Sequence, residues 1–469
     1  MRGVGVRTAF AGYEDADAVA LAGAVDETPL LPWSEAEYLK KLTFTQFVIY
    51  LVGFSEGLTH LAALAIYYLL KDDLGLSPPE VSAIFIAPAI PWVFKPFFAF
   101  LSDSVAILGY RRKPYMIVFS ALEAVGFLML GLSPASVGTA ISSLFLISLS
   151  AAFCSAVAEA LVVESTTGKT LDQSAENVSD FITAKAIGSL AVAYFSGYLL
   201  EKTSKGSIFV ATATFPLFIT IVSFFMKDVT TPPERNLKAQ FRELSEFLKQ
   251  SVIWGPALYI FVYMAGPDYD DALFFFFTNK LGFSPTFMGT LRFTYGVAAL
   301  LGVLLYRFVF RQAGFRQTLF WTIIVAVPIY VSPVILVTGL NQKLGISNQA
   351  FVLSGGFLIE ATAEIQLLPL LVLTASICPP GLEGSVYGMM MSIRNSGSMV
   401  SRGLSAFFTW AVGITATNFS HLTAYILLCG AWLLLPLFFL GFIPDNAEVE
   451  EVKQHHDKLY KEIKQQQSA

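Results

Sequence analysis

Long apolar runs joined by short polar loops make up most of this chain. A helix rising 1.5 Å per residue needs about 20 mostly apolar residues to cross a hydrocarbon core about 30 Å thick, and each run has at least that length. The runs lack the period-two alternation of membrane β-strands. The pattern therefore predicts an all-α membrane protein. Twelve transmembrane helices are expected, at residues 44–70, 80–101, 114–133, 138–164, 178–200, 207–226, 252–278, 286–310, 317–339, 348–377, 384–411 and 421–443.

The composition also indicates a membrane protein. Hydrophobic residues make up 55% of the 469 residues and charged residues only 14%. Soluble proteins usually have about 25% charged residues. The net charge of −5 offers no basic surface for a nucleic acid. These values exclude a soluble enzyme, a nucleic-acid-binding protein and a disordered scaffold.

Motifs that carry enzyme chemistry are missing from the sequence. Its four histidines are scattered, and it has no zinc motif, no nucleotide-binding loop and no spacing typical of a catalytic triad. The three cysteines fall in or beside apolar runs, so no disulfide framework is expected. We therefore expect neither an enzyme nor a cofactor nor a bound metal. The missing nucleotide site also argues against an ATP-driven pump.

Four short motifs of the first half of the chain recur in the second half, in the same order. The distance is nearly constant, 281 − 74 = 207 residues for the first pair, so each motif recurs six predicted helices later on the same side of the membrane. The pairs are Leu74–Pro78 with Leu281–Pro285, Gly109–Arg111 with Gly314–Arg316, Ala156–Glu159 with Ala361–Glu364, and Lys185 and Gly188 with Arg394 and Gly397. Two parallel six-helix repeats are therefore expected. This is the arrangement of major facilitator transporters, whose halves rock about a site at mid-membrane.

The repeat divides the chain into two bundles and three flanking segments. The loops after predicted helices 2, 6 and 8 are rich in Lys and Arg, which predicts that they and both termini are cytoplasmic. Apolar residues at helical spacing within 234–250 predict an interfacial amphipathic helix. The expected units are an N-terminal tail at 1–43, an N-terminal six-helix bundle at 44–226, a linker with the amphipathic helix at 227–251, a C-terminal six-helix bundle at 252–443 and a C-terminal tail at 444–469.

Several motifs resemble those of the folate–biopterin transporter family, a branch of the major facilitator superfamily. They are Lys71–Pro78, Lys95-Pro96, Ser102–Ser104, Gly109–Arg112, Glu159 with Val163-Glu164, and Pro379–Tyr387. The resemblance runs from about residue 44 to residue 443. It implies transport of folates, pterins or related compounds, although some members of the family carry other substrates.

A few ionisable residues lie deep in the predicted helices, where a charge costs at least ~2.5–3.5 kcal/mol and should face a partner or water. Lys185 and Arg394 are equivalent in the two repeats, and across a central cavity they can hold an anion such as a carboxylate of folate. Glu159 and Glu364 are also equivalent, and either can bind the N–H edge of a pterin ring or carry a coupling proton. The alternative is structural, with Lys185 and Arg394 forming ion pairs with Glu159 and Glu364.

Three other groups are candidates for proton coupling. Glu56 and His60 are four residues apart on predicted helix 1, so they are expected to share a face and to relay a proton. Glu123 lies deep in predicted helix 3. For all three residues the alternative is a polar patch packed against neighbouring helices.

A charged cluster marks the predicted cytoplasmic loop after helix 2. Asp103, Arg111 and Arg112 lie at this loop. We expect them to form a charge network that gates the inner side of the transporter, rather than to contact the substrate.

Together, these patterns predict a secondary active transporter of folates, pterins or related organic anions. It is expected to work by alternating access as a proton symporter. The alternative is a transporter of the same fold with another amphipathic metabolite as its cargo. The expected partners are the small-molecule substrate, the lipid bilayer and protons, and no nucleic acid. The expected location is the plasma membrane, with an endolysosomal, vacuolar or plastid membrane as alternatives.

Overall fold

The computed structural model describes residues 35–165, 171–226, 251–306, 314–377 and 383–445, together with 448, 449 and 451. Across these ranges the chain is almost entirely helical, and the only β-bridge is an isolated pair between Ile107 and Tyr110. The predicted all-α class is confirmed. The predicted amphipathic helix and most of both predicted tails lie outside the described residues.

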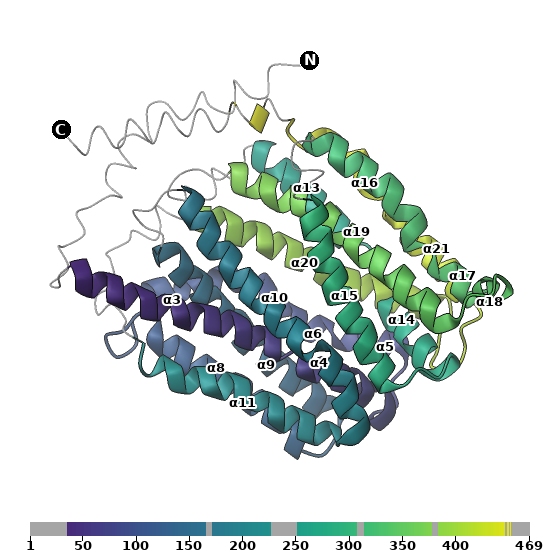
Figure 1. Ribbon diagram of the computed structural model, residues 1–469, viewed down its shortest axis with the longest axis horizontal. Coiled ribbons are helices and arrows are strands. Elements are labelled where there is room, and N and C mark those ends of the chain that lie inside the picture. The colour runs from purple at the N-terminus through teal and green to yellow at the C-terminus, as the bar shows by residue number, and fades with distance from the viewer. Residues whose placement is uncertain are drawn as a thin grey trace.

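The helices form two groups that follow one another along the chain. The first group, called here the N-terminal half, contains α3 (Glu35–Leu58), α4 (Leu61–Tyr68), η1 (Leu69–Asp73), α5 (Pro78–Ile84), α6 (Ile86–Val93), α7 (Lys95–Ser104), α8 (Lys113–Leu132), α9 (Val137–Ser165), α10 (Leu171–Lys202) and α11 (Lys205–Ser223). The C-terminal half contains α13 (Ser251–Met264), α14 (Asp270–Phe275), η2 (Phe276–Lys280), α15 (Pro285–Leu305), α16 (Phe315–Tyr330), α17 (Pro333–Val337), α18 (Leu340–Lys343), α19 (Asn348–Ile377), α20 (Glu383–Ala411), α21 (Leu422–Trp432) and η4 (Leu435–Phe442). Figure 1 shows the two groups side by side, the first in purple to teal and the second in green to yellow.

Nine segments of the described residues are long and apolar enough to cross a membrane. They are Phe47–Asp73, Pro78–Ser102, Lys113–Leu132, Val137–Leu161, Lys205–Ser223, Pro285–Leu305, Phe315–Val337, Asn348–Leu370 and Leu422–Phe442. The remaining predicted segments, at 178–200, 252–278 and 384–411, are also largely helical, within α10, α13 to η2, and α20. The chain is therefore an integral, multi-pass membrane protein. That these last three segments also cross the membrane stays a prediction.

The sequence repeat has a structural counterpart in the turns that follow η1 and η2. Both π-helical turns are followed by a glycine with positive φ, Gly75 at 65° and Gly282 at 67°. Glycine is favoured there because residues with a Cβ rarely adopt this conformation. The next helix then begins in the same way in both halves, with a serine at the N-cap and a proline as the first residue. These are Ser77 and Pro78 for α5, and Ser284 and Pro285 for α15. These two segments of the repeat therefore fold alike.

The two halves meet along α10 and α15, and along α20 with α5 and α6. Gly197 of α10 lies so close to α15 that a Cβ on it would stand 2.0 Å from the backbone oxygen of Pro285. Small residues permit such close helix contacts in membranes. The contact lies toward the end of the molecule where the chain turns at 74–77 and 281–284, called here the distal end (Figure 1).

Aromatic side chains join the two halves near the distal end. Residues 274–277, all phenylalanines, are buried. The ring of Phe274 on α14 packs against Tyr67 and Tyr68 of α4, with ring centroids 4.9 and 5.4 Å apart. The four phenylalanines therefore belong to the core, and their contacts help to close the distal end.

Candidate functional site

Lys185 lies where α10 crosses α3, inside the N-terminal half. Gly188 makes this crossing close, because a Cβ on it would stand 2.3 Å from the backbone oxygen of Phe54. The ammonium group of Lys185 donates to Glu56 Oε1 and forms an ion pair with it. The Lys185 side chain remains 36% exposed, whereas that of Glu56 is only 11% exposed. The lysine is therefore held by one carboxylate and stays accessible on another side.

Glu159 pairs with Lys95, a residue to which the sequence assigned no role. Lys95, the first residue of α7, donates to Glu159 Oε1 over 2.6 Å and to Ser155 Oγ over 3.0 Å. The alternative that Lys185 pairs with Glu159 is therefore wrong. The signal for Lys95 was its position in an apolar run, where a lone cation needs a partner.

Trp92 of α6 contacts both of these lysines. The ammonium nitrogens of Lys95 and Lys185 lie 5.4 and 5.6 Å from its ring centroid, within the range of cation–π attraction. On the other side of the interface, Asn395 of α20 donates to the backbone oxygen of Trp92 over 3.0 Å. The two ion pairs of the N-terminal half therefore lie next to the C-terminal half.

The structure separates the predicted proton-coupling residues into two environments. Helix α3 ends at Leu58, so Glu56 and His60 do not lie on one continuous helix as expected. His60 instead forms a hydrogen bond between its Nδ1 and Ser189 Oγ at 2.8 Å. Glu123 of α8 is only 6% exposed and lines a small cavity together with Glu56.

In the C-terminal half, several deep ionisable side chains have no partner within the described residues. Arg394 lies near the middle of α20, which packs closely on α13 because a Cβ on Gly397 would stand 3.0 Å from the backbone oxygen of Phe261. Within the part of the chain that the structure describes, Arg394 has no ion pair and no hydrogen bond, and the alternative pairing with Glu364 is not formed. The same holds, over the same residues, for the side chains of Glu360, Glu364 and Arg292.

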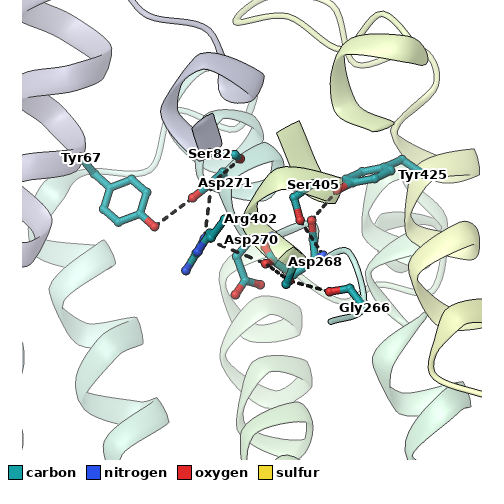
Figure 2. A network of polar contacts seen from close by, with 10 residues as sticks. Tyr67, Ser82, Gly266, Asp268, Asp270, Asp271, Arg402, Ser405 and Tyr425 are labelled. Atoms are coloured by element: carbon teal, nitrogen blue, oxygen red, sulfur yellow. Dashed lines mark hydrogen bonds and ion pairs between the residues drawn. The ribbon is translucent and has the colours of Figure 1, made fainter. Parts of the chain in front are cut away.

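A further polar cluster, which the sequence did not assign, lies at the distal end (Figure 2). The carboxylate of Asp271 on α14 is 4% exposed and accepts hydrogen bonds from Tyr67 of α4 over 2.9 Å and from Ser82 of α5 over 2.5 Å. Arg402 of α20 approaches the same carboxylate to 3.4 Å. Since both hydroxyl donors belong to the N-terminal half, Asp271 ties the two halves together.

Asp268 fixes the segment that carries Asp271 (Figure 2). Its backbone nitrogen donates to Ser405 Oγ over 2.8 Å, and its backbone oxygen accepts from the Tyr425 hydroxyl over 2.5 Å. Its carboxylate lies 3.2 Å from Ser401 Oγ and 4.0 Å from Arg402. Three aspartates at 268, 270 and 271, directly after Gly266-Pro267 in an apolar run, were the sequence signal for this cluster.

The residues expected to form the inner gate lie at the opposite end. Arg111 and Arg112 are buried, with 7% and 3% of their surface exposed, just before α8. Asp103 belongs to α7, but its side chain lies outside the described residues. Their gating role therefore stays a prediction.

Sequence comparisons link this chain to known carriers along nearly its whole length. A family model described as "BT1 family" matches residues 56–463. Folate transporter 2 of Plasmodium falciparum is 52% identical, over 90% of this chain and 93% of the relative. The folate-biopterin transporter of Synechocystis sp. is 34% identical over 87% and 83%, and folate transporter 1 of Plasmodium falciparum is 31% identical over 89% and 84%. The resemblance to folate–biopterin transporters is confirmed, and these relatives are named as transporters rather than enzymes.

Solved structures show the same fold at low sequence identity. The crystal structure of a D-xylose-proton symporter matches with a TM-score of 0.63 at 14% identity, covering 86% of this chain and 98% of that one. The nucleoside transporter NupG matches with a TM-score of 0.60 at 11% identity, covering 86% and 98%. A bacterial homologue of the human lysosomal transporter Spinster matches with a TM-score of 0.57 at 13% identity, covering 89% and 98%. The predicted major facilitator fold is therefore confirmed.

Proposed function

Because this chain belongs to the BT1 family, we propose that it moves folates, pterins or related organic anions across a membrane by alternating access. Three relatives whose names include folate align with at least 87% of this chain, which supports assigning the same activity to the whole chain. The proposed location is the plasma membrane, with both termini in the cytoplasm.

The observation that carries the proposal is the pair of cations at equivalent repeat positions, one in each half. Arg394 has no carboxylate partner within the described residues, and Lys185 is partly exposed beside the interface. A guanidinium binds a carboxylate through two parallel hydrogen bonds, whereas an ammonium acts as a point charge. Arg394 is therefore proposed to take the substrate carboxylate first, and Lys185 to join when it leaves Glu56.

The ring of a pterin offers N–H donors to a carboxylate. Glu364 is proposed to accept from this edge, because its carboxylate has no partner among the described residues. Glu159, its repeat equivalent, is already held by Lys95 at 2.6 Å. Its proposed role is therefore the weaker contact to the ring.

Alternating access requires the distal end to open and close. The Asp271 cluster is proposed to be the lock of this end, because its hydrogen bonds from Tyr67 and Ser82 must break before the halves can part there. With cytoplasmic termini, the locked end faces the outside. Asp103, Arg111 and Arg112 are proposed to form the corresponding gate at the inner end.

Coupling to protons is proposed to involve Glu56, Glu123 and His60. Glu56 connects proton binding to substrate binding in this proposal, since it pairs with Lys185 and lines a cavity with Glu123. A proton on Glu56 removes the charge that holds Lys185. The substrate anion can then bind Lys185 without competition from the ionised Glu56 carboxylate.

Uptake into proteoliposomes tests the proposed function. Purified chain should accumulate labelled folate when the side that holds the substrate is made acidic, and unlabelled pterins should compete. Failure of both folate and pterin to be transported, together with transport of another amphipathic metabolite in a competition panel, would assign the fold to a different cargo. Arg394→Glu should abolish uptake while the folded protein is retained.

A further inference from the structure

A small polar cavity lies between helices of the N-terminal half. Four helices of this half enclose it, and two of the lining residues are glutamates. The lining residues are Val52, Ser55 and Glu56 of α3, Ser120 and Glu123 of α8, Ala151, Cys154 and Ser155 of α9, and Pro216 and Ile219 of α11. Carboxylates are costly in a membrane-embedded bundle, so their convergence on one cavity needs a physical reason.

Both glutamates have unused oxygens at this cavity. Glu56 Oε1 pairs with Lys185, but Glu56 Oε2 is buried without a hydrogen-bond partner among the residues that the structure describes. Glu123 is more than nine-tenths buried, and no residue in the described ranges donates to its carboxyl or pairs with it. Buried polar atoms of this kind are rarely left unsatisfied in native proteins. Both glutamates therefore present carboxylate oxygens that accept no hydrogen bond within the described residues.

The charges around the cavity do not cancel when both glutamates are ionised. The groups that face Glu56 are Glu123 of α8, Lys185 of α10, Lys95 of α7 and His60 before α4, while α9 contributes the thiol of Cys154 and α11 no titratable group. Lys95 is bound to Glu159, and Lys185 compensates Glu56. When Glu123 is ionised, its negative charge therefore has no counter-ion in the described residues.

We propose that the cavity binds one monovalent cation, a proton or a sodium ion, between Glu56 and Glu123. Carboxylate and hydroxyl oxygens are the ligands that hard cations take, and Ser55 and Ser120 add hydroxyls to the lining. The binding site itself does not depend on the proposed function. The consequence for coupling does rest on the proposed function, because a cation bound to Glu56 weakens the ion pair between Glu56 and Lys185.

Thermal unfolding of the purified full-length chain in lipid nanodiscs tests the site without any substrate. One arm replaces choline chloride by sodium chloride at constant ionic strength and mildly alkaline pH. The other arm acidifies the sodium-free buffer. Binding should raise Tm by about 2 °C or more in the arm that supplies the true ligand. A rise with sodium identifies sodium, and a rise with acid alone identifies the proton.

Variants separate this site from other surface groups. Glu123→Gln should abolish the shift, whereas Glu451→Gln, which removes one negative charge from an exposed residue outside the bundle, should retain it. A Tm that moves in neither arm, or that moves equally in Glu123→Gln, overturns the proposal. If wild-type protein shows the shift but transports no folate, the cation site stands and the proposed function fails.

Carbodiimide labelling of the unmutated chain covers the case in which Glu123→Gln does not fold. Dicyclohexylcarbodiimide modifies carboxyl groups in apolar surroundings. Peptide mapping by mass spectrometry should find it on Glu123 or Glu56, blocked by sodium or enhanced by acid according to the ligand. Labelling that responds to neither condition, or that misses both residues, contradicts the site.

Discussion

The two halves of the chain share one repeated sequence pattern, but their equivalent ionisable residues differ in ion pairing. In the N-terminal half, Lys185 is paired with Glu56 and Lys95 with Glu159. In the described part of the C-terminal half, Arg394 and Glu364 have no such partner. The two cations thus occupy equivalent positions of the repeat, but within the described residues only Lys185 is neutralised by a carboxylate. We propose that Arg394, the unpaired one of these two equivalent cations, binds the substrate anion first, and that Lys185 does so once it leaves Glu56.

The largest expected effect comes from reversing the charge of the C-terminal cation. Arg394→Glu should lower folate uptake by at least about 100-fold, because a bidentate, charge-assisted contact becomes a repulsion. Arg394→Lys should keep part of the activity with a raised KM. The check is initial-rate uptake in proteoliposomes, normalised to folded protein by size-exclusion chromatography. An unchanged KM in Arg394→Glu would return this residue to a structural role.

The close helix crossings should also differ between the halves. A Cβ at Gly188 would stand 2.3 Å from a backbone oxygen, whereas at Gly397 the nearest atom is Met264 Cβ, a side-chain atom, at 2.8 Å. Gly188→Ala should therefore lower stability by about 1–3 kcal/mol, and Gly397→Ala by less. Thermal unfolding of the two variants measures this. Equal losses would show that the two crossings are equally tight.

Releasing the N-terminal cation should make the two halves more alike. Glu56→Gln removes the carboxylate that holds Lys185, so the KM for an anionic substrate should fall by about tenfold. The double variant Glu56→Gln with Lys185→Gln should lose this gain, which isolates the pair in a double-mutant cycle. Uptake kinetics at fixed pH provide the measurement. A KM that rises in Glu56→Gln would mean that Glu56 itself contacts the substrate.

The smallest expected effect concerns the link between the halves. Tyr67→Phe removes one hydrogen bond to Asp271, which is worth about 1 kcal/mol and shifts the distal equilibrium toward opening by about fivefold. Tyr68→Phe is the matched control, since the Tyr68 hydroxyl has no hydrogen-bond partner in the described residues.

The rate at which a thiol reagent labels a cysteine placed at the buried Ala272 reports this opening. It should rise in Tyr67→Phe and remain unchanged in Tyr68→Phe. Equal rates in both variants would remove Asp271 from the lock.

The fold was predictable because the length of each apolar run is a local property of the sequence, and the repeat is visible by comparing the two halves of the sequence directly. The turn after η1 could even be matched to that after η2, since Gly75 and Gly282 share the positive φ that the motif requires. The break after Leu58 was not visible, because no proline or glycine marks Thr59 and His60. The nearest helix-weakening residue is Gly57, which also permits the close contact with α10.

The site was only partly predictable, because ion pairing depends on how helices cross. Sequence spacing identified Lys185 as an embedded cation, but the close approach at Gly188 selects Glu56 rather than Glu159 as its partner. The distal cluster joins residues from α4, α5, α14 and α20, and Asp271 is about 200 residues away from Tyr67. Such contacts follow from tertiary packing, which no local pattern encodes.

A structure of the chain with bound folate tests the central claim most directly. The account predicts a folate carboxylate within hydrogen-bonding distance of the Arg394 guanidinium, with Lys185 turned from Glu56 toward the ligand. Folate bound at the interface without contact to Arg394, and with the Lys185–Glu56 pair intact, would contradict it.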